Sequence, residues 1–355
     1  MLESEVLPLR DPLTLPYSGA VAELSLVDEA SASYLLSVDG IPQSQVCVSD
    51  ATRLGFDYVR HIARMVDVWA APGEALPCIH LGGGALSLAR YVEATRPGSQ
   101  QLVIDSQQGM VEGLLEVLPL AAGHATRLLF GDARELAERL VLRRRLLRAS
   151  AGSLDAACSG AMAAGAGVVV IDLWEGSVIP SHVATLEFYL LVAQLAAPEA
   201  LVVVNLLDGG PGFDYSRGQA ATLRRVWSNV GVLRDPSMLG RAGSCPEGSL
   251  AGCVGVACSG GVGGAADAAA DSEGFGNVVL VASRRRLDFL ETPDWLRDEP
   301  RPHHALSGHD VDAWVAGAPA VTDEASAASP RPPSRGAQPG SHCRDVHLGV
   351  TSRGA

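Results

Sequence analysis

Glycine and aspartate residues stand at the ends of short apolar runs in the middle of the chain, where they could bind a ligand. They are Gly82, Gly83, Gly84, Asp105, Asp132 and Asp172. Consecutive glycines let the backbone approach a ligand closely, and a carboxylate can accept hydrogen bonds from both hydroxyls of a ribose. One acid after a strand is commonly a helix cap, but three acids behind a glycine loop favour a shared nucleoside-type ligand.

The spacing within the loop bears on which ligand this is. The dinucleotide fingerprint G-x-G-x-x-G fails because Ser87 stands at the third glycine position, and that fingerprint leaves Asp132 and Asp172 unexplained. S-adenosylmethionine or its decarboxylated form fits better. The loop would then face the sulfonium side, Asp105 the ribose and Asp132 the adenine amino group.

Strand-like and helix-like patterns alternate from residue 76 onward. The apolar runs predict strands at 77–81, 101–104, 126–130, 167–171, 200–205 and 277–283. The intervening patterns predict helices at 85–96, 107–118, 133–148, 183–197 and 214–229. This order indicates an α/β domain with a mostly parallel sheet, in which ligands bind outside the carboxyl ends of the strands.

The rest of the chain divides around this domain. Residues 1–50 contain short β-rich runs and an Asp39-Gly40 turn signal, which predict a small antiparallel β-lobe. Asp50 is expected to cap a helix that carries Tyr58 and Trp69, at the start of an α/β domain spanning 51–325. Residues 149–166 and 241–274 are rich in Ala and Gly and are expected to be mobile insertions, and 326–355 to be a disordered tail.

Several motifs together resemble spermidine synthase and its relatives, the polyamine aminopropyltransferases. The motifs are VDGIPQ (38–43), GFDY (55–58), LGGG (81–84), VID (103–105), GDA (131–133) and VVVIDLWEGSVIPSHVATLEFY (168–189). The resemblance covers roughly residues 20 to 325 without the insertions. It implies a Rossmann-like class I methyltransferase fold, with a mostly parallel sheet preceded by a small antiparallel β-lobe. It also implies a homodimer.

The same resemblance implies a role for each matching residue. Asp105 falls on the ribose carboxylate, and Asp132 with Ala133 on the adenine contact. The resemblance places Asp172 on the catalytic base that accepts a proton from the attacking amine. Glu175 falls where the family has an Asp that grips the far ammonium of a diamine. Gln43 and Tyr58 fall on positions that help to enclose the site.

The chain departs from the family pattern on the acceptor side. The glycine loop continues with Ala85 where the family has an Asp, Glu175 is one methylene longer than the usual Asp, and Trp174 replaces a Ser. Three functions stay open. They are aminopropyl transfer from decarboxylated S-adenosylmethionine to a diamine, methyl transfer from S-adenosylmethionine to an unknown small acceptor, and a non-catalytic relative.

The composition also limits the classes of partner that the protein is expected to bind. The formal net charge is −13 and all basic residues are arginines, which argues against nucleic-acid binding and suits a small cationic or amine substrate. No apolar run reaches the roughly 20 residues that a bilayer requires, so we expect a cytoplasmic protein without membrane contact. The seven cysteines show no metal-binding spacing, so no metal is expected.

Overall fold

The computed structural model describes residues 11–149, 164–209, 212–234, 275–292, 295 and 304–331. Residues 150–163 of the first predicted insertion and all of the second, 241–274, lie outside these ranges. The two ends of the first insertion differ from expectation. Ala149 is the last residue of helix α4 (Ala133–Ala149), and Ala166 is the first residue of strand β8 (Ala166–Ile171).

The β-lobe is a four-stranded antiparallel sheet in the order β1-β2-β3-β4. Its strands are β1 (Leu13–Leu15), β2 (Ala22–Asp28), β3 (Ser33–Val38) and β4 (Ile41–Cys47). Asp39 and Gly40 join β3 to β4 with φ angles of 49° and 74°. Two successive positive φ values are typical of the tight turn that matches strand twist, so the predicted hairpin is confirmed.

The second sheet has eight strands in the order β12-β10-β11-β9-β8-β5-β6-β7. Besides β8, they are β5 (Cys78–Leu81), β6 (Gln101–Asp105), β7 (Thr126–Phe130), β9 (Ala196–Gly209), β10 (Asn229–Arg234), β11 (Phe275–Ser283) and β12 (His304–Leu306). The pairings among β5 to β9 are parallel, whereas β11 is antiparallel to β9 and β10, and β12 is antiparallel to β10. The expected class I methyltransferase fold with its mostly parallel sheet is confirmed.

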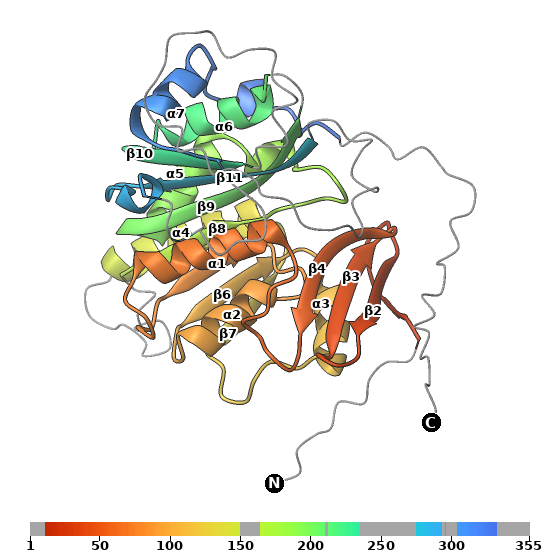
Figure 1. Ribbon diagram of the computed structural model, residues 1–355. Coiled ribbons are helices and arrows are strands. Elements are labelled where there is room, and N and C mark those ends of the chain that lie inside the picture. Colours follow the sequence, from red (N-terminus) through yellow and green to blue (C-terminus); the bar gives the residue numbers. More distant parts are fainter. Residues whose placement is uncertain are drawn as a thin grey trace, which may run out of the picture.

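Helices cover both faces of this sheet, and the β-lobe lies beside it (Figure 1). Besides α4, they are α1 (Asp57–Trp69), α2 (Ser87–Thr95), α3 (Gln108–Val117), α5 (Leu186–Leu195), α6 (Asp214–Leu223) and α7 (Gly308–Val315). Alternate residues of β5 show why both faces are buried: Cys78 packs with α1 and α2, whereas Ile79 and Leu81 pack with α4 and α5. A third apolar cluster joins the β-lobe to α3.

Two local expectations were wrong. Asp50 does not cap a helix, because its side chain accepts hydrogen bonds from Thr52 in a turn and α1 begins only at Asp57. The helix expected over 214–229 ends at Leu223. Residues 224–226 form a turn, and β10, which hydrogen-bonds both β11 and β12, begins at Asn229, so tertiary pairing overrides the local pattern at this last residue.

The start of the predicted tail contacts the α/β domain. Ser329 is buried, its amide donates to the Ile179 carbonyl at 3.1 Å, and its Oγ accepts from the Ile179 amide at 2.8 Å. Ser329, which lies within the predicted tail, is therefore bonded to the domain. Residues 332–355 lie outside the described part of the chain.

Arginine side chains close the carboxyl ends of several helices. Arg96 is only 1% exposed and donates to backbone carbonyls between residues 66 and 74, at the end of α1, over 2.7 to 3.3 Å. Arg90, Arg144 and Arg217 donate in the same way at the ends of α3, α5 and α7. Because the last carbonyls of a helix lack partners within it and carry partial negative charge, a cation there satisfies both needs.

We predict that Arg96→Met lowers the free energy of unfolding by about 2–3 kcal/mol, because it leaves buried carbonyls without donors. Urea unfolding followed by circular dichroism measures the change. Arg53→Met is the matched control, since Arg53 is largely exposed and lies 3.9 Å from Asp28, and its loss should cost under about 0.5 kcal/mol. Equal effects of the two substitutions would contradict the capping role of Arg96.

Candidate active site

A cavity of about 350 Å³ opens between the β-lobe and the carboxyl ends of the central strands. The order of the large sheet reverses there, because β5 pairs with β6 on one side and with β8 on the other. Such a switch point is where open α/β sheets bind ligands. The residues expected from sequence that line it are Gln43, Tyr58, Gly82, Gly83, Gly84, Asp105 and Asp172.

The glycine loop after β5 forms one wall of the cavity. Gly82 has a φ angle of 90°, and a Cβ atom at this position would lie 2.0 Å from the carbonyl oxygen of Asp172. Only glycine fits, because such an approach to backbone cannot be relieved by side-chain movement. A Cβ on Gly83 would likewise lie 3.3 Å from Asp105 Oδ2, in the space beside the carboxylate.

Asp105 ends β6 with both oxygens turned toward backbone amides. Its Oδ2 accepts from the amide of Gly83 and its Oδ1 from the amide of Gln107, each at 2.8 Å. These two bonds fix the carboxylate between the glycine loop and the start of α3. Each oxygen keeps a further lone pair, so the group can still accept hydrogen bonds from a ligand in the cavity.

Asp172 follows β8 and holds three hydrogen bonds from uncharged donors. Its Oδ1 accepts from Trp174 Nε1 at 2.6 Å and from Asn205 Nδ2 at 2.8 Å, and its Oδ2 accepts from the Tyr58 hydroxyl at 3.2 Å. Burial raises the pKa of the Asp172 carboxyl above its ordinary value, whereas these hydrogen bonds act in the opposite direction. The result is a fixed, partly desolvated carboxylate with no cationic partner among these contacts.

Two asparagines behind Asp172 were missed by the sequence reasoning. Asn205 lies in β9, and its Oδ1 accepts from Asn277 Nδ2 of β11 at 3.0 Å, so the amide of Asn205 is oriented to donate to Asp172. Both line the cavity. The available signal was one amide within the apolar run LVVVNLL, because an unpaired polar group at such a buried position would be costly.

Tyr58 and Gln43 reach the cavity from different elements. Tyr58 lies in the first turn of α1, and burial together with the charge of Asp172 raises the pKa of its phenol well above the ordinary value. Its hydroxyl therefore stays protonated and donates a hydrogen bond to Asp172 across the physiological range. Gln43 lines the cavity from β4 of the β-lobe, and its Nε2 lies 3.4 Å from the Ile41 carbonyl.

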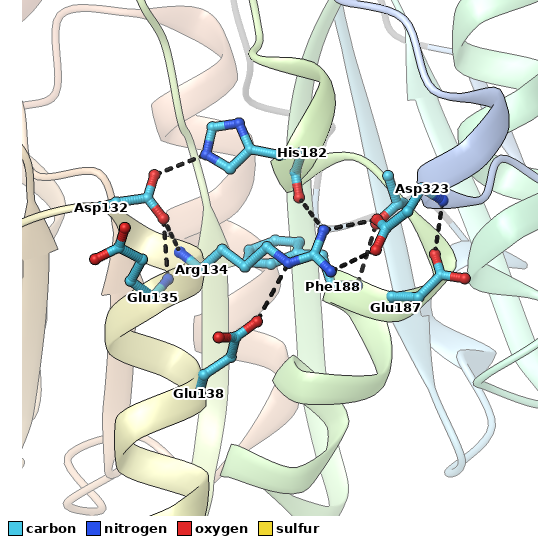
Figure 2. Close-up of polar contacts among 9 residues, drawn as sticks. Asp132, Arg134, Glu135, Glu138, His182, Glu187, Phe188 and Asp323 are labelled. Atoms are coloured by element: carbon cyan, nitrogen blue, oxygen red, sulfur yellow. Dashed lines mark hydrogen bonds and ion pairs between the residues drawn. The ribbon is translucent and has the colours of Figure 1, made fainter.

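Asp132 and Ala133 are not among the residues that line the cavity. Asp132 Oδ1 accepts from the amides of Arg134 and Glu135 at the start of α4, and Oδ2 lies 2.7 Å from His182 Nε2 (Figure 2). Burial acts to raise the pKa of Asp132, but the bonds from Glu135 and His182 lower it overall. Asp132 thus serves as a helix cap in this structure, and its adenine contact stays a prediction.

The neighbouring Arg134 joins this region to the C-terminal segment. Its two terminal nitrogens each donate to Asp323 at 2.6 Å, and one also donates to the His182 carbonyl at 3.0 Å (Figure 2). The Asp323 amide in turn donates to Glu187 Oε2 at 2.9 Å. Together with the bonds between Ser329 and Ile179, these contacts bind residues 179–187, which follow Asp172 in the chain, to the C-terminal segment.

Glu175 does not line the cavity, although its charge helps to raise the pKa of Tyr17, which does. Glu175 is exposed, and its backbone pairs with Val178 in a tight turn through Gly176, whose φ angle is 62°. Gly176 and Ser177 line the cavity in its place. The structure therefore brings Asp105 and Asp172 together but leaves Glu175 outside.

Tyr17 also lines the cavity and was not expected from the sequence. Burial, followed by the charge of Asp105, raises the pKa of its phenol. No motif marks it, because it lies between β1 and β2 and meets the site only through the packing of the β-lobe.

Among the described residues, no group of three or more His, Cys, Asp or Glu could hold a metal ion, and no helix is long and apolar enough to cross a bilayer.

Comparison with solved structures identifies the fold. A probable spermidine synthase from Corynebacterium glutamicum superposes with a TM-score of 0.67 at 20% identity, covering 89% of this chain and 97% of that one. A spermidine synthase from Thermotoga maritima gives 0.48 at 11% identity over 89% and 94% of the two chains. Human methyltransferase-like protein 13 in complex with SAH gives 0.45 at 13% identity over 74% and 93%.

Sequence comparison adds no family assignment. No protein-family model matches the chain, and no curated protein matches it. At 20% identity the likeness to the first structure shows the fold alone. The chain thus has a spermidine synthase-like class I methyltransferase fold.

Proposed function

We propose that this protein transfers an aminopropyl group from decarboxylated S-adenosylmethionine to an amine, with Asp172 as general base. The observation that carries the proposal is the position of Asp172, which faces the same cavity as Asp105 and the glycine loop and holds only uncharged donors. A carboxylate so placed can take a proton from an ammonium group that enters the cavity.

The cavity fits the nucleoside part of this co-substrate. Asp105 keeps free lone pairs for a pair of hydroxyls, and the loop beside it lacks side chains at Gly82, Gly83 and Gly84. Apolar Met110 from α3 and Leu173 lie on the same lining, where they can contact an adenosyl group. These residues would orient the reacting carbon, which contributes on the order of 7–11 kcal/mol in well-aligned reactions.

The charge of the lining favours the decarboxylated form. The described residues that line the cavity include two carboxylates, Asp105 and Asp172, and no arginine or histidine. The methionine carboxylate of S-adenosylmethionine would find no cation among them. The decarboxylated form has no carboxylate and needs no such cation, and its positive sulfonium and ammonium are compatible with an acidic cavity.

The chemistry is one nucleophilic displacement. The co-substrate supplies a carbon whose bond to sulfur breaks, with the electron pair passing to sulfur, as the lone pair of the acceptor amine forms the new bond to that carbon. Asp172 first removes a proton from the acceptor ammonium, because only the neutral amine has a lone pair to donate. The Tyr58 and Trp174 contacts hold the carboxylate in place while it does so.

A second candidate, methyl transfer from S-adenosylmethionine, has one observation in its favour. Ala85 is fully buried at the end of the glycine loop, where the resemblance implies a carboxylate for the aminopropyl ammonium. Without that acid the loop gives the decarboxylated co-substrate less support. Titration calorimetry with both co-substrates decides between the two: tighter binding of the decarboxylated form supports aminopropyl transfer, and tighter binding of the intact form supports methyl transfer.

We predict that Asp105→Ala abolishes co-substrate binding, whereas Asp172→Asn retains it and lowers kcat by about 10²- to 10⁴-fold. Asp105 contacts the ligand, but Asp172 acts only on the proton. Calorimetry and the release of methylthioadenosine measure the two effects. Asp214→Asn, at a side chain 90% exposed on α6, is the control and should change neither. Full activity of Asp172→Asn would show that Asp172 is not the base.

The hydrogen bond from Trp174 gives a separate prediction about pH. The base works only when ionised, so kcat/KM is high above the pKa of Asp172 and decreases as the pH falls through this pKa. Trp174→Phe removes a bond that lowers this pKa, so the acidic limb of the kcat/KM profile should move to higher pH. Trp295→Phe, whose Nε1 donates to the Phe289 carbonyl away from the cavity, should leave the limb in place. An unmoved limb in Trp174→Phe would remove Asp172 as the group that titrates.

A further inference from the structure

We infer that the acceptor carries one positive charge, on the nitrogen that reacts, and that the remainder of the acceptor is neutral and largely apolar. This inference rests on the proposed amine transfer and names the substrate class for the same cavity. It differs from the diamine that the family resemblance implies.

The count of carboxylates in the cavity limits the charge of the acceptor. Asp105 and Asp172 are the acids among its described lining residues. Asp105 is bound to the amides of Gly83 and Gln107 beside the glycine loop, on the co-substrate side. Asp172 alone is therefore left to face the acceptor, and it can compensate one ammonium.

Glu175 is not among the described residues that line the cavity, so its carboxylate does not contact an acceptor held there. Its backbone accepts from and donates to Val178, at 3.2 and 2.8 Å, which closes the turn and leaves the side chain exposed. The turn is fixed further along by the two hydrogen bonds between Ile179 and Ser329. The chain next to the cavity contributes the uncharged Gly176 and Ser177.

Apolar side chains form much of the remaining wall. They are Leu36, Val38, Ile41, Pro42, Phe56 and Leu207. Ile41 is 47% exposed, so an apolar side chain from β4 stays open to solvent beside the cavity. Such a wall gains free energy by covering a hydrocarbon body, whereas a second ammonium against it would lose its hydration without a compensating charge.

Neutral amides do not alter this balance. Asn277 uses its Nδ2 to orient Asn205, and Gln43 is the amide that the β-lobe presents to the cavity. An amide oxygen can accept a hydrogen bond from an ammonium but supplies no net negative charge to offset it. Gln43 is therefore the position at which one substitution can add the missing charge with little change of shape.

The first test measures binding without turnover. Protein loaded with methylthioadenosine, the thioether product, is titrated calorimetrically with hexylamine and with hexamethylenediamine, which have the same carbon chain. We expect hexylamine to bind at least about tenfold more tightly, the order of one charge left without a partner. Equal binding, tighter binding of the diamine, or binding of neither amine would overturn the inference.

The second test adds a carboxylate. Gln43→Glu should shift the ratio of the two affinities toward the diamine by about tenfold. Gln45→Glu is the matched control, because it makes the same change in the same strand, with a side chain that packs beside Gly55 and does not line the cavity. The control should keep the wild-type ratio. If Gln43→Glu also keeps the wild-type ratio, or if both variants shift it equally, the inference fails.

Product analysis separates this inference from the proposed function. Mass spectrometry of mixtures with decarboxylated S-adenosylmethionine shows whether aminopropylated amine forms. If hexylamine is preferred in binding but no product forms with any amine, the proposed transfer fails and the assignment of the pocket to singly charged amines stands. If the aminopropylated diamine forms with the higher kcat/KM, the transfer stands and the inference is overturned.

Discussion

The close approach of Gly82 to the carbonyl of Asp172 is the constraint on which the site depends. The parallel pairing of β5 with β8 brings the two strand ends together, and a side chain on Gly82 would lie 2.0 Å from that carbonyl. Only glycine permits this approach. Because residue 82 is glycine, the loop after β5 can pack directly against the backbone of Asp172. Asp105 then reaches the loop from β6, and its bond to the Gly83 amide holds its carboxylate against the loop. Asp105 and Asp172 are thus positioned by one backbone contact and the register of three adjacent strands.

A second set of contacts holds the surrounding helices and loops. Arginines donate to the terminal carbonyls of four helices, and Arg96 does so while almost fully buried. In a chain without lysine, guanidinium groups serve this role well because their planar fork reaches several oxygens at once. Polar contacts also hold the segment around Asp323 and Ser329. Arg134 binds Asp323, and Ile179 binds Ser329. Long-range polar contacts of this kind leave little trace in sequence periodicity.

The sequence predicted the parts of the fold and site that depend on local pattern. Continuous apolar runs placed β5 to β9, and the acids at their ends include Asp105 and Asp172, because strand ends and glycine loops have strong compositional signals. Asn205 and Tyr17 were missed, since their roles arise only when β9 and the β-lobe meet the cavity. Glu175 was expected from a family pattern, but the turn to Val178 leaves its side chain outside. Asp50 and β10 show the same limit. Asp50 accepts a hydrogen bond from the Thr52 hydroxyl instead of capping a helix, and β10 forms a strand because it pairs with β11.

The choice of donors around Asp172 matters for its chemistry. A cation in contact with the carboxylate would lower its pKa and weaken it as a base. Trp174, Asn205 and Tyr58 instead satisfy its oxygens without adding charge, so burial still raises the pKa toward the range in which a general base is most effective. The carboxylate then remains an unpaired negative charge, and Asp105 is the other acid among the described residues that line the cavity. In the proposed reaction, an incoming ammonium would complete this charge balance, and the transfer of its proton to Asp172 would remove both charges at once and leave a neutral nucleophile beside the apolar wall.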